Sequence, residues 1–130
     1  MLNQVKIAQT GRAGEFYAAY FLEAAGVECH RVDKNAADLW CQLPSGLIVT
    51  VQVKSAQKAT LPKLAASPVY RFHTPKTITP VDWYMFIALD LQLVHLKPTA
   101  DVVKKSTTIK PHEFTAEAQA ADLAAFLSQG

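Results

Sequence analysis

The chain has 130 residues, of which half are hydrophobic and 18% are charged, a balance typical of folded globular proteins and not of disordered or fibrous ones. This length predicts a single domain over residues 1–130 that can bury a core. No apolar run reaches the length of a membrane span, and residues 1–12 lack the apolar stretch of a signal peptide, so we expect a cytoplasmic protein with no membrane partner. The net charge of +2 is compatible with nucleic-acid binding but does not indicate it.

A first helix is expected over residues 4–25, where apolar residues recur every three or four positions and Gly26 follows as a stop. Gly11 and Gly14 have low helix propensity, so we expect a break or a cap near Thr10. The apolar stripe of this helix consists of Phe16, Tyr17, Tyr20, Phe21, Ala24 and Ala25.

Apolar and alternating runs predict strands in the rest of the chain, followed by a last helix that Thr115 caps. Residues 55–68 are expected to form a loop or a ragged helix, and residues 98–110 an irregular stretch. The strand candidates are residues 27–32, 38–43, 47–54 and 69–73. Residues 82–89 and 91–96 follow and are expected to form a tight hairpin or a strand with a bulge. The large aromatic residues expected in the core are Trp40, Trp83 and Tyr84. The order of elements predicts an α/β fold with a mixed β-sheet flanked by helices.

The strand over residues 47–54 changes character at its end. Successive side chains of a strand alternate between faces, so the valines share one face, while the other passes from Ile48 and Thr50 to Gln52 and Lys54. A strand that ends in an amide and an ammonium group delivers two polar side chains to one spot.

The preceding strand brings an acidic residue to the same spot. If residues 44–46 form the turn, Leu43 pairs with Leu47, and the numbers of paired residues sum to 90. Asp38 then lies opposite Gln52 on the same face, and a slip of one residue would move it to the other face. The register that keeps the aliphatic residues together therefore also joins the three polar ones.

A carboxylate beside an amide and a lysine suits divalent-metal chemistry on phosphates, with Mg²⁺ as the expected cofactor and Mn²⁺ as a possible substitute. Asp38 would supply the carboxylate, Gln52 an amide oxygen, and the backbone of Val53 a carbonyl ligand. Lys54 would orient or deprotonate the attacking water, or offset charge at the phosphate. The four histidines show no metal-ligand spacing, and the two cysteines are interpreted as buried thiols.

Three motifs in this order resemble those of the PD-(D/E)XK nucleases. They are Gly14-Glu15 on the first helix, Ala37-Asp38-Leu39 opening a strand and Gln52-Val53-Lys54 ending the next. They are most similar to the small group I intron-encoded homing endonucleases of cyanobacterial type, a branch in which a Gln can replace the usual acidic residue. The resemblance covers residues 11–55 and, more loosely, residues 70–96.

This resemblance implies a restriction-endonuclease-like core and Mg²⁺-dependent hydrolysis of DNA phosphodiester bonds. By the motif, Glu15 is the helix carboxylate and a further metal ligand, and Asp38 is the central ligand. Gln52 stands in for the acid, and Lys54 is the motif lysine. Ala37 replaces a proline that carries no chemistry. The amide at position 52 matters more, because it binds Mg²⁺ more weakly than a carboxylate and cannot take up a proton.

The middle of the chain is basic, since no acidic residue occurs between Lys54 and Lys76. A surface that faces DNA phosphates needs local positive charge, and a solvated loop rich in lysine is the alternative. The residues expected to bind nucleic acid are Lys58, Lys63, Arg71 and Lys76.

The sequence therefore predicts a metal-dependent DNA endonuclease of homing or restriction-like type. A homodimer or homotetramer is expected, because cutting both strands takes two sites. Two alternatives stay open: a structure-selective nuclease such as a Holliday junction resolvase, and a nucleic-acid-binding module that has lost catalysis. The amide of Gln52, in place of a carboxylate, is the feature that favours the second.

Overall fold

The centre of the protein is a mixed β-sheet of five strands in the order β1-β2-β3-β5-β6, and a separate two-stranded sheet pairs β4 with β7. We describe it from a computed structural model, which covers residues 2–34, 37–74, 81–102 and 106–129. Strands β3 and β5 are parallel, and the other neighbouring strands are antiparallel. The elements are α1 (Leu2–Ala24), β1 (Glu28–Lys34), β2 (Ala37–Gln42), β3 (Ile48–Ala56), β4 (Tyr70–His73), β5 (Trp83–Ala88), β6 (Leu93–Pro98), η1 (Thr99–Asp101), β7 (Ser106–Ile109), η2 (Pro111–Glu113) and α2 (Ala116–Leu127).

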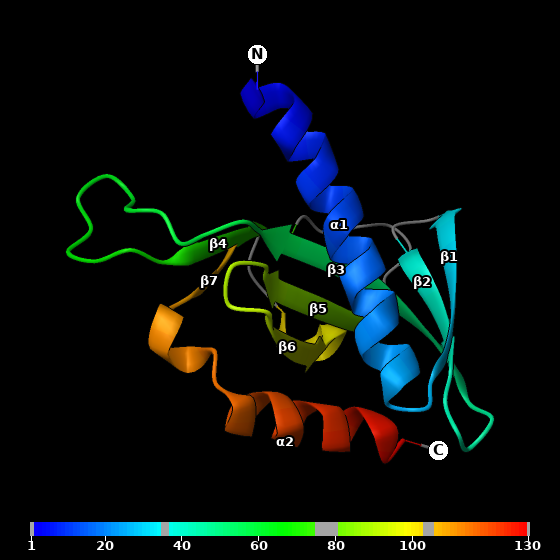
Figure 1. The fold of residues 1–130 in the computed structure, drawn as a ribbon. Helices are drawn as coiled ribbons and strands as arrows, with labels where there is room; N and C mark the ends of the chain where they lie inside the picture. Colours follow the sequence, from blue (N-terminus) through cyan, green and yellow to red (C-terminus); the bar gives the residue numbers. More distant parts are fainter. Residues whose placement is uncertain (1, 35–36, 75–80, 103–105, 130) are drawn as a thin grey trace.

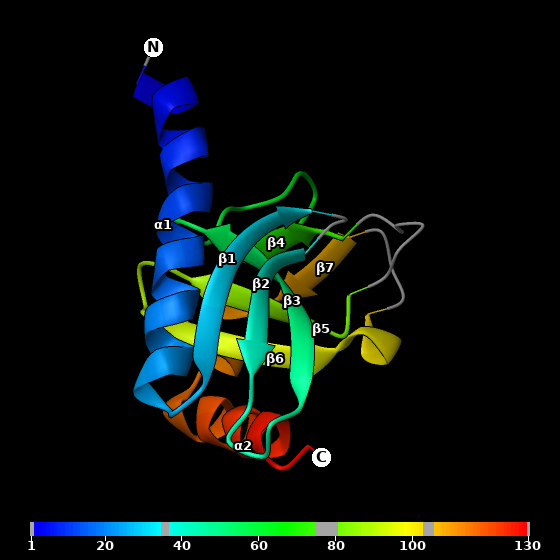
Figure 2. The ribbon, with the colours of Figure 1, turned by 90° about the vertical axis from the view of Figure 1, so that its right-hand side faces the viewer.

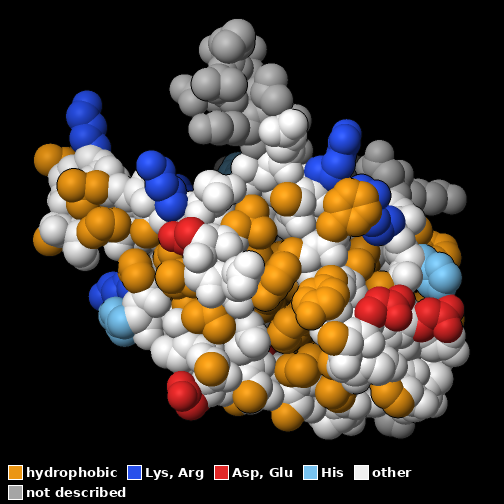
Figure 3. All heavy atoms as spheres, viewed as in Figure 1, with side chains coloured by type: hydrophobic (Ala, Val, Ile, Leu, Met, Phe, Trp, Pro, Cys, Tyr) orange, Lys and Arg blue, Asp and Glu red, His pale blue; other side chains and the backbone are white. Residues whose placement is uncertain are grey.

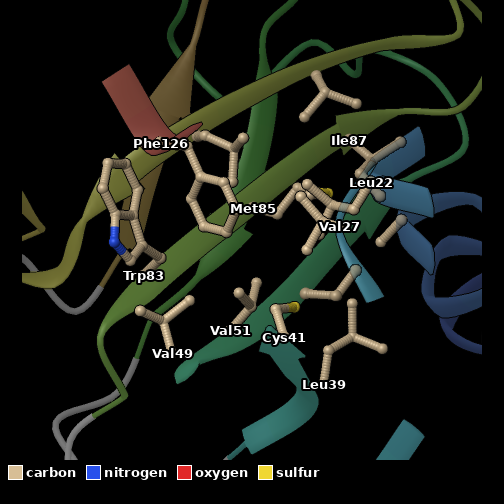
Figure 4. Packing of buried hydrophobic residues seen from close by; sticks show 14 of the residues in the cluster. Leu22, Val27, Leu39, Cys41, Val49, Val51, Trp83, Met85, Ile87 and Phe126 are labelled. Atoms are coloured by element: carbon tan, nitrogen blue, oxygen red, sulfur yellow. The ribbon is translucent and has the colours of Figure 1, made fainter. Parts of the chain in front are cut away.

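Two helices cover one face of the main sheet: α1 packs mainly on β3 and β1, and α2 packs on β6 (Figures 1 and 2). Between these helices and the sheet lies the larger apolar cluster, shown in Figure 4. Leu22 of α1 and Phe126 of α2 are both fully buried in it, and the Phe126 ring stands edge-on to Trp83 of β5. The expected mixed sheet flanked by helices is confirmed.

The opposite face of the sheet carries a second apolar cluster, closed by β4 and β7. Tyr70 and Phe72 of β4 point inward, and Phe72 contacts the ring of Phe86 from β5. Arg71 and His73 point away from this cluster and are exposed. The chain therefore buries apolar groups on both faces of its central strands, as the six consecutive buried residues of β5 require.

Helix α1 differs from its sequence pattern in two respects. It continues without a break through Thr10 and ends at Ala24, where Gly26 adopts a φ of +91°. The predicted aromatic stripe coincides only in part with its buried face. Tyr17 and Phe21 pack against the core, whereas Phe16 and Tyr20 are 54% and 69% exposed and the fully buried residues are Ala18 and Leu22. Small residues let the helix approach β3 closely, so the aromatic rings are displaced to its flanks.

Other boundaries also shift from expectation. Strand β3 runs two residues beyond Lys54, and the stretch expected to be irregular contains β7 and η1. Trp40 is 47% exposed on β2, so its expected burial was wrong, whereas Trp83 and Tyr84 are buried as predicted. Thr115 caps α2 by accepting a hydrogen bond from the Ala118 N–H at 3.0 Å, as predicted. None of the helices in the described ranges is long and apolar enough to cross a membrane.

Candidate active site at the open edge of β3

The β2–β3 hairpin has the register derived from the sequence. Leu39 pairs with Val51 and Cys41 with Val49, so paired residue numbers sum to 90. Leu39, Val51 and Val53 all belong to the cluster under the helices. Because strand residues alternate between faces, Gln52 and Lys54 share the opposite face. Asp38 lies next to them, since its carboxylate accepts the Val53 N–H and acts on the pKa of Lys54. The fold therefore brings these three predicted residues together.

The regular pairing of the sheet stops beside Asp38. The β2–β3 pairs end at Leu39 and Val51, although β3 continues to Ala56. On the other side of β2, the register with β1 shifts between Arg31 and Lys34. Bulges and interrupted ladders of this kind often occur next to active sites, where they re-aim side chains. The edge of β3 that faces β2 is consequently open at the predicted site.

Asp38 occupies this opening and replaces a ladder hydrogen bond. Its Oδ2 accepts a hydrogen bond from the Val53 N–H at 2.8 Å. The N–H and C=O of one strand residue lie on the same edge, so the Val53 carbonyl also points toward the side of β2. A side-chain carboxylate and a backbone carbonyl thus meet at one place.

Gln52 contributes an atom that lacks a partner. Its Oε1 is buried and, among the described residues, accepts no hydrogen bond. A buried polar atom left unsatisfied costs about 1–3 kcal/mol, so such atoms are uncommon in stable folds. On the same face its register neighbour is Tyr84 of β5, which is buried. No donor from the described residues therefore satisfies the amide oxygen.

Lys54 is half-buried on the same face, with Phe86 as its register partner in β5. Burial lowers the pKa of the Lys54 ammonium group from its ordinary value, and the nearby Asp38 carboxylate partly counteracts this by raising the pKa. A lysine whose charged form is destabilised loses its proton more readily than a solvated one. The site thus places the Lys54 ammonium group within electrostatic reach of the Asp38 carboxylate.

A close helix-to-strand contact fixes the end of β3 behind this site. A Cβ added to Gly14 would lie 2.4 Å from the Ser55 Oγ and 2.5 Å from the Ser55 Cβ, so only glycine fits there. The Ser55 hydroxyl donates a hydrogen bond to the Thr10 carbonyl at 3.0 Å. Gly14, predicted from the motif without a structural role, is the point at which α1 rests on β3.

The motif carboxylate Glu15 lies beside this contact, on α1, and has a cation as its partner. Arg31 Nη2 on β1 donates to Glu15 Oε1 at 2.9 Å, and the Arg31 guanidinium lies 4.3 Å from the centre of the Phe16 ring. To bind a metal, Glu15 would exchange this guanidinium for the ion. Its role as a metal ligand stays a prediction.

The donor set fits a hard divalent cation with few charged ligands. In the parts of the chain that the structure describes, no three Asp, Glu, His or Cys side chains gather as a metal cluster would. A Mg²⁺ ion here would therefore depend on Asp38, the unsatisfied Gln52 oxygen and the Val53 carbonyl, with water completing its shell. Oxygen donors of these kinds suit Mg²⁺ and Mn²⁺ and do not suit zinc, which favours nitrogen and sulfur ligands.

Three of the four predicted DNA-binding residues are exposed. Lys58 and Lys63 are exposed on the segment after β3, and Arg71 is exposed on β4. Lys76 lies outside the described residues. On the face shown in Figure 3, the visible Lys and Arg side chains lie along the upper edge of the view and at its left side.

Arg31 and Ser55 are the residues that the sequence analysis missed. Arg31 lies in a strand with mixed polar and apolar residues, and only the β1–β2 register, which pairs it with Leu39, places it next to the site. Ser55 follows the motif lysine directly, and the close approach of Gly14 is the signal that could have shown its role.

Comparison with known proteins gives one informative result. The sequence matches no family model and no curated protein. Among solved structures, the chain is similar to a bacterial homing endonuclease, I-Ssp6803I, with a TM-score of 0.71 and 20% sequence identity over 93% of this chain and 91% of that one. The two proteins share a fold along almost their whole length.

Proposed function

We propose that this protein is a metal-dependent DNA endonuclease that hydrolyses phosphodiester bonds. The observation that carries the proposal is the buried Gln52 Oε1, which accepts no hydrogen bond from the described residues and belongs to the same strand end as Lys54, next to Asp38 at an interrupted sheet edge. Unsatisfied buried oxygens and lysines with lowered pKa values cost stability and are typical of functional sites. The fold shared with a homing endonuclease supports the same reaction class.

In this proposal, Asp38, Gln52 and the Val53 carbonyl would hold a Mg²⁺ or Mn²⁺ ion, and Glu15 would be a further ligand in place of its pairing with Arg31. A bound divalent ion would supply positive charge that polarises the scissile phosphate and lowers the pKa of water. The Val53 N–H fixes the orientation of the Asp38 carboxylate through the 2.8 Å hydrogen bond.

Lys54 acts on the attacking water. In its neutral form it accepts a proton from the water, and in its charged form it stabilises the additional negative charge that develops on the phosphate. The lowered pKa makes the neutral form accessible at a lower pH than for an exposed lysine. The exposed Lys58, Lys63 and Arg71 hold the flanking DNA phosphates.

The enzyme is proposed to be of homing or restriction-like type and to act as a homodimer or homotetramer. One chain offers one such site, and cleavage of both DNA strands takes two. A cut confined to one strand by a monomer would contradict this assembly.

A second candidate function is a DNA-binding module without catalysis. The observation in its favour is that position 52 is an amide, which gives the site one formal charge fewer than a second carboxylate would. This candidate shares the DNA surface with the first and differs only in chemistry.

Nicking of supercoiled plasmid separates the two candidates. The protein is incubated with plasmid in Mg²⁺, in Mn²⁺ and in EDTA, alongside the Lys54→Met variant purified in the same way. We expect nicking in either metal, none in EDTA and none by Lys54→Met. Binding of plasmid without nicking in either metal would support the binding module. Preferred cutting of four-way junctions over linear duplex would instead indicate a junction resolvase.

A further inference from the structure

A projecting arm follows the candidate site directly along the chain. The arm consists of residues 57–69, between the end of β3 and the start of β4, and Figure 1 shows it standing away from the rest of the molecule. Its neck is closed by two hydrogen bonds, from the Thr60 N–H to the Val69 carbonyl at 2.9 Å and from the Val69 N–H to the Thr60 carbonyl at 2.8 Å. The arm is thus closed at its neck by one antiparallel β-bridge, and residues 61–68 beyond it form turns and bends without further strand pairing.

The tip of the arm is a tight turn with an unusual residue. The Ala65 N–H donates to the Pro62 carbonyl at 3.1 Å, which closes a four-residue turn. Its third position is Leu64, with a φ of +67° and a fully exposed side chain. Turns with a positive φ at this position normally have Gly or Asn there, because a branched apolar residue is strained. A Leu at this point is unfavourable for the isolated protein in both conformation and solvation.

The charge around the tip indicates which kind of binding partner Leu64 contacts. Lys63 precedes it, Lys58 lies at the base of the arm, and no acidic residue occurs between positions 55 and 74. In Figure 3 the outer part of this arm shows hydrophobic and basic side chains together. A strongly basic neighbourhood fits a polyanion, so an exposed apolar tip here has DNA as its complementary partner.

We propose that the arm enters the major groove of duplex DNA and that Leu64 contacts the methyl groups of thymine. This inference rests on the proposed DNA endonuclease function. The major groove, about 12 Å wide, admits a protruding segment more readily than the minor groove, about 6 Å wide. The major groove presents the thymine C5-methyl, the apolar group that a Leu side chain can cover. Lys63 and Lys58 then lie at the phosphates on either side.

The test compares thymine with uracil, which differs only by that methyl group. Short duplexes selected by the wild-type protein from a randomised library are copied with either dTTP or dUTP, and binding is measured by fluorescence anisotropy in EDTA. We expect the wild type to bind the thymine copy about fourfold more tightly, the effect of burying about one methyl group. Leu64→Ala should bind both copies equally and close to the wild-type affinity for the uracil copy.

Two further variants keep the result interpretable. Leu64→Gly removes the side chain and accepts the positive φ, so its fold is at least as stable, and it should behave as Leu64→Ala does. Lys63→Ala should weaken binding to both copies alike and reduce the salt dependence by about one phosphate contact, while keeping the thymine preference.

The inference is overturned if Leu64→Ala keeps the thymine preference of the wild type, or if it binds both copies as the wild type does. A change in oligomeric state on Leu64→Ala, seen by light scattering, would also overturn it, because the tip would then contact a second copy of the chain. If the wild type cleaves plasmid while Leu64 proves neutral, only this inference fails. If the wild type binds no duplex, the proposed function fails with it.

Discussion

The Asp38 carboxylate and the Val53 backbone form one unit, because Asp38 Oδ2 accepts the Val53 N–H at 2.8 Å where the β2–β3 ladder ends. The hydrogen bond ties the proposed metal ligand to the strand that carries the other site residues. Replacing Asp38 by Asn keeps an acceptor oxygen, whereas replacing it by Ala leaves the Val53 N–H without this partner.

We expect Asp38→Ala to lower the free energy of unfolding by about 1–3 kcal/mol, the cost of losing a charge-assisted bond to a half-buried donor, and Asp38→Asn to change it by about 0.5 kcal/mol or less. Urea denaturation of both variants checks this. Equal destabilisation by the two substitutions would show that the charge and not the hydrogen bond holds this edge.

Two substitutions of Gln52 should change the free energy of unfolding in opposite directions. Gln52→Leu removes the unsatisfied oxygen and should raise the free energy of unfolding by about 1 kcal/mol while abolishing cleavage. Gln52→Glu adds a carboxylate beside Asp38. It should bind Mn²⁺ about tenfold more tightly, because affinity of such sites rises with ligand charge, and should be less stable in EDTA through like-charge repulsion.

Calorimetric titration with Mn²⁺ and thermal unfolding with and without the ion measure both effects. The larger Mn²⁺-dependent rise in Tm should belong to Gln52→Glu. If Glu at this position leaves Mn²⁺ affinity unchanged, residue 52 is not a ligand.

Lys54 should couple stability to pH. Burial lowers its pKa in the folded protein below the ordinary 10.5, so between the two pKa values the unfolded chain binds more protons than the folded one. The charged lysine therefore costs stability at neutral pH, and this cost disappears as pH rises through that window. Lys54→Met should be more stable than the wild type by about 0.5–1 kcal/mol near pH 7, and the gain should shrink toward pH 10.5.

Denaturation curves across this pH range test the coupling, with Lys58→Met as a matched exposed control that should show no such trend. If the gain in the free energy of unfolding on Lys54→Met is constant with pH, a change in packing or polarity causes it, and protonation of Lys54 does not.

Gly14 and Ser55 should show strong energetic coupling. Gly14→Ala places a methyl group 2.4–2.5 Å from Ser55 atoms, and the overlap should cost about 1–3 kcal/mol of stability. Ser55→Gly removes both clashing atoms, so the double variant should recover most of the loss due to Gly14→Ala. Ser55→Ala should not rescue, because it retains the Cβ. A double-mutant cycle with additive effects would contradict the close approach.

The sequence was sufficient for the register of the β2–β3 hairpin and insufficient for the buried face of helix α1. The alternation in residues 47–54 and the turn at residues 44–46 determined the hairpin register. Both are local signals, and burial of the apolar face favours the same register. The apolar stripe predicted for α1 did not identify its most buried residues, because burial depends on the strand against which the helix packs. Only the partner strand shows that small residues near Gly14 face β3 and that Phe16 and Tyr20 stay outside.

Interactions between distant segments were beyond the sequence for the same reason. The Arg31–Glu15 pair joins β1 to α1, and the sequence pattern around either residue does not indicate which partner it has. The strain at Leu64 is likewise a property of the turn that holds it. The predicted residues nevertheless lie close together, because the Asp38 carboxylate accepts the N–H of Val53, which stands between Gln52 and Lys54. Their functional roles stay predictions.

The most direct measurement is single-turnover cleavage of plasmid DNA in Mg²⁺ by the wild type and by Asp38→Asn, with DNA affinity measured on the same samples. Asp38→Asn keeps the acceptor for the Val53 N–H, so folding and DNA binding should persist and any loss isolates the chemistry. We expect the wild type to nick and then linearise the plasmid, and Asp38→Asn to bind it equally well and leave it intact. Cleavage at the same rate by both proteins would contradict the proposed site.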